Sequence, residues 1–196
     1  HRDLHSFPTR RSSDLVAIVG LGNIGREIVR KLSSFDMEIV GVNRSWREEF
    51  RSLPLERFCP LERIEEAIPS MDFIVLSLAL SSETGLLFSS RLFSLLKEGV
   101  FLVNIARAGL IDKNALLESL RRKRLGGVGL DVFWEEPPDP EDELFSFPEV
   151  IATPHVGAIT ELAFQGILSA VAQNIQRMAS GEMPMHCVNS EFVGVR

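Results

Sequence analysis

Four side chains suited to anion binding or proton transfer each follow an apolar run of the sequence. Arg107 lies in the segment NIARAG, Asp131 and Glu136 lie in LDVFWEEP, and His155 ends ATPH. Arginine binds anionic oxygens, and a histidine with a carboxylate is a common acid–base pair. Taken singly, each also fits a plainer interpretation: a turn-capping arginine, a surface carboxylate or a loop histidine. If the apolar runs are parallel strands, their C-terminal ends share one edge, and these side chains could converge on one cleft.

A glycine-rich turn, GLGNIG, follows the first apolar run and opens a helical pattern. Gly20 would allow the tight turn, Gly22 would let the backbone approach a pyrophosphate, and Gly25 would let the helix pack on the strand. The amides near Asn23 and Ile24 would then point at the phosphates. This context predicts a dinucleotide-binding loop, although the glycine pattern alone also occurs as a turn in unrelated α/β proteins.

The residues after the second apolar run bear on which dinucleotide binds. An NAD site usually has an acidic residue about 20 residues beyond the glycines, and this residue accepts a hydrogen bond from the ribose 2′-hydroxyl. This chain instead has Asn43, Arg44 and Ser45, followed by Arg47. Arg44 can pair with a 2′-phosphate, and Ser45 can donate a hydrogen bond to it. The sequence therefore favours NADP over NAD, unless both arginines are simply solvated residues at a helix start.

Apolar runs alternate with helical patterns from residue 16 to residue 179. Strands are expected at 16–19, 37–42, 72–80, 101–105, 128–132 and 150–152. A first helix is expected where Ile24, Ile28, Val29 and Leu32 fall on one helical face. Further helical stretches are expected at 47–53, 61–67, 89–97, 112–124 and 160–179. Asp112 is expected to cap its helix and Gly126 to end it. This alternation predicts an α/β protein with a Rossmann-type, doubly wound parallel sheet.

The composition argues against several classes of protein. No run of about 18 apolar residues suggests a membrane span. The net charge of −6 argues against a nucleic-acid partner, and the basic cluster 121–124 is expected to be a solvated helix end. Cys59 and Cys187 match no metal-site or CxxC spacing, so no metal is expected. A reduced, cytoplasmic setting is the default for such a chain.

Over nearly all of residues 16–190 the chain resembles the D-isomer-specific 2-hydroxyacid dehydrogenase family. The matching segments are GLGNIG, LALSSET, NIARAG, LDVFWEEP, TPHVGAIT and GEMPMHCVN. The resemblance implies an oxidoreductase that moves a hydride between NAD(P)H and a small 2-oxo acid or D-2-hydroxy acid. The expected preference for NADP favours the glyoxylate or hydroxypyruvate reductase type within that family. It also implies a homodimer when full length. A 3-phosphoglycerate dehydrogenase and a non-catalytic, NAD(H)-sensing corepressor-like protein remain alternatives, whereas Glu136 argues against a formate dehydrogenase.

The resemblance also implies a role for each candidate residue. Arg107 would hold the carboxylate and ketone oxygens of the substrate. His155 would protonate the ketone oxygen, and Glu136 would orient the imidazole and favour its charged form. Asp131 would fix the nicotinamide carboxamide. Further cofactor contacts are implied at Ala79, Thr84, Ile105, Ala106 and Gly157.

Two positions depart from the family pattern. Ala79 stands where the family usually has proline, so the loop that faces the cofactor is expected to be less rigid. Ala108 replaces a glycine after the arginine, and a positive φ at that position would strain an alanine.

Residues 1–15, HRDLHSFPTRRSSDL, stand apart from that resemblance. HRDL imitates a kinase catalytic loop, but Pro8 occupies the position of the required asparagine. A transit peptide and a disordered arm are further alternatives. The stretch also resembles, codon by codon, a translated short-read sequencing adapter. We therefore expect an adapter-like, non-native segment at 1–15 and a dinucleotide-binding domain at 16–159. Residues 160–196 would form a C-terminal helix and tail that return to a substrate domain otherwise missing through 5′ truncation.

Overall fold

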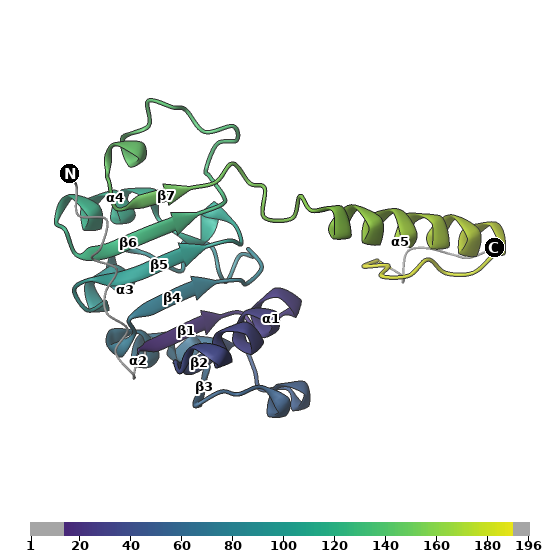
Figure 1. Cartoon of the computed structure of the whole chain (residues 1–196), viewed down its shortest axis with the longest axis horizontal. Helices are drawn as coiled ribbons and strands as arrows, with labels where there is room; N and C mark the ends of the chain where they lie inside the picture. The colour runs from purple at the N-terminus through teal and green to yellow at the C-terminus, as the bar shows by residue number, and fades with distance from the viewer. Residues whose placement is uncertain (1–13, 190–196) are drawn as a thin grey trace. The chain divides into compact units, whose positions relative to one another are not determined.

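The computed structural model describes residues 14–189, which belong to two compact units, residues 14–155 and residues 156–189. The first unit is built on a seven-stranded, all-parallel sheet with the strand order β3-β2-β1-β4-β5-β6-β7 (Figure 1). The order reverses between β1 and β4, which makes the sheet doubly wound and creates a crevice of the kind where such sheets bind ligands. The predicted Rossmann-type α/β fold is confirmed.

The bounds of the elements follow the alternation seen in the sequence. The strands are β1 (Leu15–Val19), β2 (Glu38–Asn43), β3 (Arg57–Pro60), β4 (Phe73–Leu76), β5 (Val100–Asn104), β6 (Leu125–Leu130) and β7 (Val150–Ala152). The α-helices of this unit are α1 (Asn23–Leu32), α2 (Ile64–Ala67), α3 (Ser90–Leu95) and α4 (Lys113–Arg121). Short 3-10 helices are η1 (Ser33–Phe35), η2 (Glu48–Ser52), η3 (Leu61–Arg63), η4 (Ile68–Ser70), η5 (Ala108–Leu110) and η6 (Glu143–Ser146).

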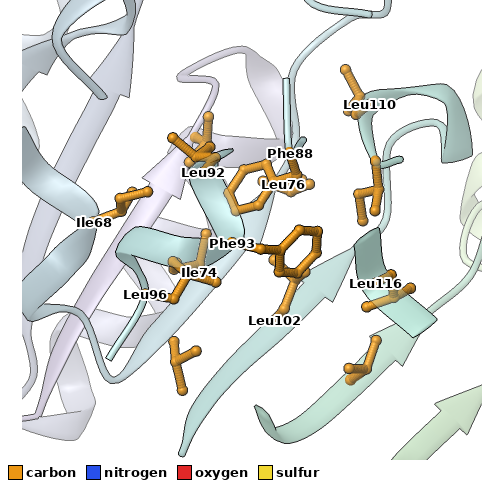
Figure 2. Close-up of a cluster of buried hydrophobic side chains, with 14 of the residues drawn as sticks. Ile68, Ile74, Leu76, Phe88, Leu92, Phe93, Leu96, Leu102, Leu110 and Leu116 are labelled. Carbon is orange, nitrogen blue, oxygen red and sulfur yellow. The ribbon is translucent and has the colours of Figure 1, made fainter. Parts of the chain in front are cut away.

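Apolar side chains cover both faces of the sheet, because successive residues of a strand point to opposite sides. Ala17 and Val19 of β1 face a large cluster with α2, α3 and α4, whereas Val16 and Ile18 face a smaller one with α1 and η2. Figure 2 shows the large cluster, in which the rings of Phe88 and of Phe93 from α3 pack edge to face with their centroids 5.9 Å apart. Each fully buried side chain of this size contributes about 1.5–3 kcal/mol to folding. The two layers therefore hold the strand ends, and the loops that follow them, in fixed positions.

Several expected boundaries differ from the structure. The strand expected at 72–80 ends at Leu76, and the apolar residues after it form a loop. The helix expected to reach residue 124 ends at Arg121, and Lys123 just after it has a positive φ of 54°. Gly126, which was expected to end the helix, lies in β6. The edge strand β3 was not predicted, because RFCP is short and lacks an apolar run.

The start of the sheet overlaps the segment expected to be non-native. Residues 1–13 lie outside the described residues, but Leu15 already belongs to β1 and pairs with Glu38. Its backbone N–H also donates a hydrogen bond of 2.9 Å to Asp72 Oδ2. The expected boundary after residue 15 thus falls inside a strand.

The second unit contains one α-helix among its described residues, α5 (Glu161–Ala179). Thr160 caps it by accepting a hydrogen bond of 3.1 Å from the N–H of Ala163. None of the helix side chains is buried, and several apolar ones, such as Leu162 and Leu168, are exposed. No helix within residues 14–189 combines the length and apolarity that crossing a membrane requires.

Removing the cap of α4 should destabilise the sheet unit measurably. As predicted, the Asp112 carboxylate accepts hydrogen bonds from the backbone N–H groups of Asn114 and Ala115, at 2.9 and 3.2 Å. Asp112→Ala leaves those donors without a side-chain partner. We therefore expect the free energy of unfolding, measured with urea, to fall by about 1 kcal/mol. Asp112→Asn keeps an acceptor and is the matched control. Equal stability of all three proteins would contradict this account of the cap.

Candidate cofactor and catalytic site

The glycine-rich turn between β1 and α1 has three glycines with different surroundings. Gly20 has a φ of +104°, and a Cβ built there would lie 2.6 Å from the backbone nitrogen of Leu78. A Cβ at Gly25 would lie 1.9 Å from the carbonyl oxygen of Gly20. Both glycines are therefore required by the fold itself. A Cβ at Gly22 would meet nothing within 4 Å, so the fold does not explain that glycine, whereas a closely approaching ligand would.

The N-terminus of α1 is open to an anion. Gly22 is the N-cap residue, so no side chain caps this end, and the first turn carries no acidic residue. The first backbone N–H groups of a helix have no partner within the helix, and the helix dipole makes this end partly positive. Asn23 Oδ1 meanwhile accepts a hydrogen bond of 2.7 Å from Arg26 Nη2. The glycines and amides of residues 20–25 thus fit the pyrophosphate of a dinucleotide.

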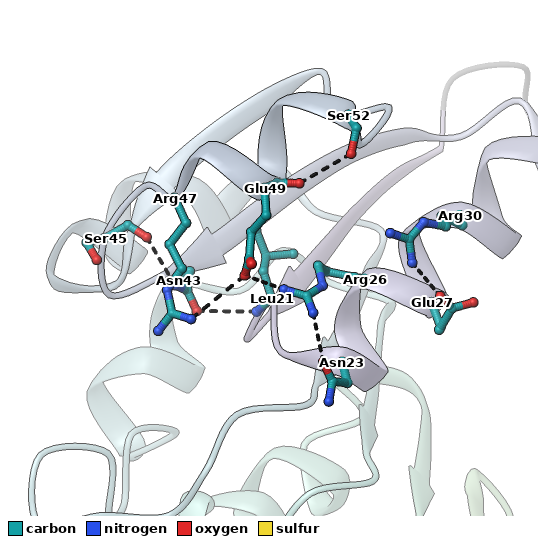
Figure 3. A network of polar contacts seen from close by, with 10 residues as sticks. All are labelled: Leu21, Asn23, Arg26, Glu27, Arg30, Asn43, Ser45, Arg47, Glu49 and Ser52. Atoms are coloured by element: carbon teal, nitrogen blue, oxygen red, sulfur yellow. Dashed lines mark hydrogen bonds and ion pairs between the residues drawn. The ribbon is translucent and has the colours of Figure 1, made fainter. Parts of the chain in front are cut away.

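The end of β2 forms one side of a cavity of about 260 Å³ next to the glycine turn. Its lining includes all three residues proposed to select the dinucleotide, together with both residues of the loop expected to contact it: Asn43, Arg44, Ser45, Ala79 and Thr84. Asn43 shapes this corner, since its Oδ1 accepts from the N–H of Leu21 at 3.3 Å and its Nδ2 donates to the carbonyl of Ser45 at 3.0 Å (Figure 3).

Thr84 holds the loop after β4 in shape. Its hydroxyl donates to the carbonyl oxygen of Ala79 at 2.8 Å and accepts from the backbone N–H of Ser81 at the same distance. The side chain is 4% exposed, so these bonds are largely shielded from water. The buried side chain of Thr84 thus links the two ends of this loop, which opposes the loss of rigidity expected from alanine at position 79.

A second cavity, of about 540 Å³, lies beside the loop after β5. It is lined by Ile24, Ser77, Leu78, Ala79, Leu80, Ile105, Ala106 and Arg107. Ile24 was expected on the packed face of its helix, but it is 59% exposed and lies at this cavity instead. An apolar wall beside an arginine is the kind of surface that suits a ring with a polar substituent.

Asn104 fixes the loop that carries Arg107, and the sequence did not single it out. Its side chain is fully buried, with Nδ2 donating to the carbonyl of Arg107 at 2.9 Å and Oδ1 accepting from the N–H of Ala106 at 3.0 Å. Arg107 Nη1 also donates to the carbonyl of Ala106 at 2.6 Å. Ala108 begins η5 without a positive φ, so the strain considered for that alanine does not arise.

His155 and Glu136, which the family resemblance pairs as an acid and its orienting carboxylate, lie within hydrogen-bond distance of each other. His155 Nδ1 lies 2.8 Å from Glu136 Oε2, and the N–H of Phe133 donates to Glu136 Oε1 at 3.1 Å. The hydrogen bond from His155, then that from Phe133, and also the charge of Arg107 lower the pKa of the Glu136 carboxyl. An ionised carboxylate only accepts hydrogen bonds, so Nδ1 is the donor and Nε2 is left for a substrate.

Asp131 lies at the end of β6 and is 9% exposed. Its backbone N–H donates to the carbonyl of Asn104 at 3.1 Å, and its Oδ1 accepts from the hydroxyl of Thr153 at 2.5 Å. Thr153 belongs to the segment ATPH, but the sequence predicted no role for it. Gly157 belongs to the second unit, and its cofactor contact stays a prediction. Among residues 14–189 no group of three metal-ligating side chains occurs.

Comparisons with known proteins agree with the Rossmann-type fold of the first unit. Residues 3–157 match the family model described as "D-isomer specific 2-hydroxyacid dehydrogenase, NAD binding domain". The matched range includes part of the adapter-like segment, whose origin stays a prediction. A glyoxylate reductase of Pyrococcus horikoshii is 36% identical over 92% of this chain and 53% of its own length. A D-3-phosphoglycerate dehydrogenase of Methanocaldococcus jannaschii is 35% identical over 89% of this chain and 33% of its own.

A solved structure gives the same result in three dimensions. The NADPH-dependent glyoxylate/hydroxypyruvate reductase of Sinorhizobium meliloti, in complex with NADP and sulfate, superposes with a TM-score of 0.77 at 29% identity. The similarity covers 91% of this chain and 56% of that one. The chain thus spans about half the length of the glyoxylate reductase it matches. The chain belongs to the D-isomer specific 2-hydroxyacid dehydrogenase family, whose substrates are 2-oxo and 2-hydroxy acids, and it carries that family's NAD(P)-binding domain.

Proposed function

We propose that the protein reduces a small 2-oxo acid to the D-2-hydroxy acid with NADPH, and that Arg107, Glu136 and His155 carry the reaction. The observation that supports this most is the Glu136–His155 hydrogen bond of 2.8 Å, with Arg107 close enough for its charge to lower the pKa of Glu136. An anion-binding arginine and an acid–base pair at the ligand-binding edge of one sheet are what a substrate with a carboxylate and a ketone requires.

Each residue has a distinct part in the proposed reaction. The bound nicotinamide cofactor supplies the hydride. Arg107 binds the substrate carboxylate and polarises the ketone. His155 donates a proton from Nε2 to the ketone oxygen as the carbon is reduced, and Glu136 keeps the imidazole oriented and stabilises its charged form. In the oxidation direction the neutral imidazole takes the proton from the hydroxyl.

Residues 20–25 and 43–45 would hold the cofactor. The open helix end and Gly22 suit the pyrophosphate, whereas Asn43, Arg44 and Ser45 suit the adenosine ribose. The absence of an acid at the end of β2 and the presence of Arg44 support NADP over NAD. Asp131, Ile105 and Ala106 remain candidates for the nicotinamide end, and a homodimer and a cytoplasmic location stay predictions.

Replacing Arg44 tests the cofactor preference. Arg44→Ala should weaken NADPH binding by roughly 10- to 100-fold, because a charge-assisted hydrogen bond to phosphate is worth about 1.5–3 kcal/mol. NADH lacks that phosphate, and its dissociation constant should change by less than about twofold. Arg51→Ala is the matched control, because Arg51 forms an exposed ion pair with Glu48 and does not line the cavity. Equal losses for both cofactors would contradict the assignment.

Turnover distinguishes the reductase from the other candidates. Because the chain spans 53% of the length of a glyoxylate reductase, the assay uses a fusion in which such a relative supplies the remainder. NADPH oxidation with glyoxylate or hydroxypyruvate would support the proposal. NAD⁺ reduction with 3-phosphoglycerate alone would favour the second candidate, which the M. jannaschii relative raises. Tight cofactor binding without any turnover would favour a sensor.

A further inference from the structure

We infer that Glu83 sets the balance between NADPH and NADH by competing with the cofactor's 2′-phosphate for Arg44. This inference rests on the proposed NADP site. The sequence has no acid at the end of β2, but the fold brings one there from a distant loop. Arg44 Nη2 donates to Glu83 Oε2 at 2.6 Å, across a sequence separation of 39 residues.

The position of Glu83 is fixed by the turn that contains it. The N–H of Glu83 donates to Ser81 Oγ at 3.3 Å, and the N–H of Gly85 donates to the carbonyl of Ser81 at 2.9 Å. Buried Thr84 ties the same turn to Ala79. Ser81 and Thr84 also line the cavity that Arg44 lines. The Glu83 backbone is therefore held between two residues at the wall of the proposed ribose site.

The other arginine at this cavity is engaged differently. Arg47 lies 3.8 Å from Glu49 Oε1, and the same carboxylate pairs with Arg26 of α1 (Figure 3). The Glu49 carboxylate is thus shared between Arg26 and Arg47. Among the ion pairs of the described residues, Arg44 is paired with Glu83 alone. Arg44 can therefore bind a phosphate fully only when it gives up its ion pair with that carboxylate.

The two cofactors respond to Glu83 in opposite ways. A 2′-phosphate carries close to two negative charges and needs the same guanidinium that Glu83 occupies, and the two anions repel each other at this range. A 2′-hydroxyl is neutral and can donate a hydrogen bond to a carboxylate, as it does to the usual acid after the second strand. Glu83 therefore disfavours NADPH relative to NADH. Both side chains are about 70% exposed, so solvent and salt limit the size of the effect.

The test compares Glu83→Gln with Glu48→Gln on the 196-residue chain. Glu48 is the matched control, because it forms an equally exposed ion pair with Arg51, at 2.9 Å, and does not line the cavity. Nicotinamide fluorescence gives the dissociation constants of NADPH and NADH at low salt, and thermal unfolding checks the fold. We expect the ratio of the NADH constant to the NADPH constant to rise roughly three- to tenfold in Glu83→Gln. Glu48→Gln should leave it unchanged.

Each outcome decides the inference. A ratio that stays constant or falls in Glu83→Gln, or that rises equally in Glu48→Gln, overturns it. If Arg44→Ala weakens NADPH binding while Glu83→Gln leaves the ratio unchanged, the inference fails and the proposed NADP site stands. If Arg44→Ala binds NADPH as tightly as the unchanged chain, the NADP site and the inference fail together. The rise should also shrink in about 0.5 M salt, where exposed charges are screened.

Discussion

His155→Gln is expected to lower kcat for ketone reduction by about 10²–10⁴-fold, the usual contribution of a positioned general acid. The variant keeps a polar side chain of similar reach but cannot donate a proton as an acid. His155 is partly exposed and contacts Glu136 through one ring nitrogen, so the fold should not depend on it. Steady-state kinetics on the fusion protein, with NADPH and each 2-oxo acid, measure the effect.

Two controls keep this result interpretable. The NADPH dissociation constant should change by less than about twofold, because His155 is not among the residues proposed to hold the dinucleotide. Thermal unfolding should be unchanged. A variant that retains most of the activity would exclude His155 as the acid, whereas a loss of cofactor binding would point to a structural role.

The pH dependence of Glu136→Gln distinguishes a positioning role of Glu136 in the reaction from a purely structural one. The lowered pKa of Glu136 means that its carboxylate stays charged well into the acidic range, so it favours the charged imidazole throughout a neutral assay. Reduction needs that charged form and must decline as the pH rises. Glutamine removes the negative charge that stabilises the charged imidazole, so the decline of the reduction rate with rising pH should begin at a lower pH. A profile that stays in place would contradict the positioning role.

Gly22→Ala is expected to weaken NADPH and NADH binding alike, by roughly 10- to 100-fold or about 1.4–2.8 kcal/mol. Gly22 has a φ of −70°, which any residue adopts, and a Cβ there meets no atom within 4 Å. The new methyl group therefore fits the fold but occupies the space through which the pyrophosphate would approach the backbone. Calorimetric titration measures binding, and thermal unfolding should shift little.

Gly25→Ala is the contrasting control for Gly22→Ala. Its Cβ would lie 1.9 Å from the carbonyl oxygen of Gly20, which is backbone and cannot move aside cheaply. This variant should lose stability together with binding, whereas Gly22→Ala should lose binding alone. If Gly22→Ala bound both cofactors normally, the pyrophosphate would not lie against this turn.

The elements that short-range patterns encode could be predicted from the sequence. Buried strands such as β1 appear as continuous apolar runs, the cap at Asp112 depends on donors two and three residues away, and the glycine spacing specifies one turn. The approach of Glu136 and His155 to one edge was also predictable, because parallel strands end at one edge and each segment follows a strand, whereas their pairing was implied by the family resemblance. Here the fold itself brings Glu136 and His155 together.

What the sequence could not reveal depends on contacts between distant segments. The end of β4 was missed because the loop after it is also apolar, and these side chains line a cavity instead of a core. Asn104 looked like any strand-end polar residue until both halves of its amide were seen to fix the Arg107 loop. The pairing of Glu83 with Arg44 could not be inferred, because only the folded sheet brings their two loops together.

Binding of the dinucleotide precedes any chemistry, so titration of NADPH into the 196-residue chain, followed by calorimetry, tests the central claim most directly. The account predicts saturable binding of one NADPH per chain, weaker binding of NADH, and a roughly 10- to 100-fold weakening of both in Gly22→Ala. A folded chain that binds neither cofactor, or that binds them unchanged in Gly22→Ala, would contradict it.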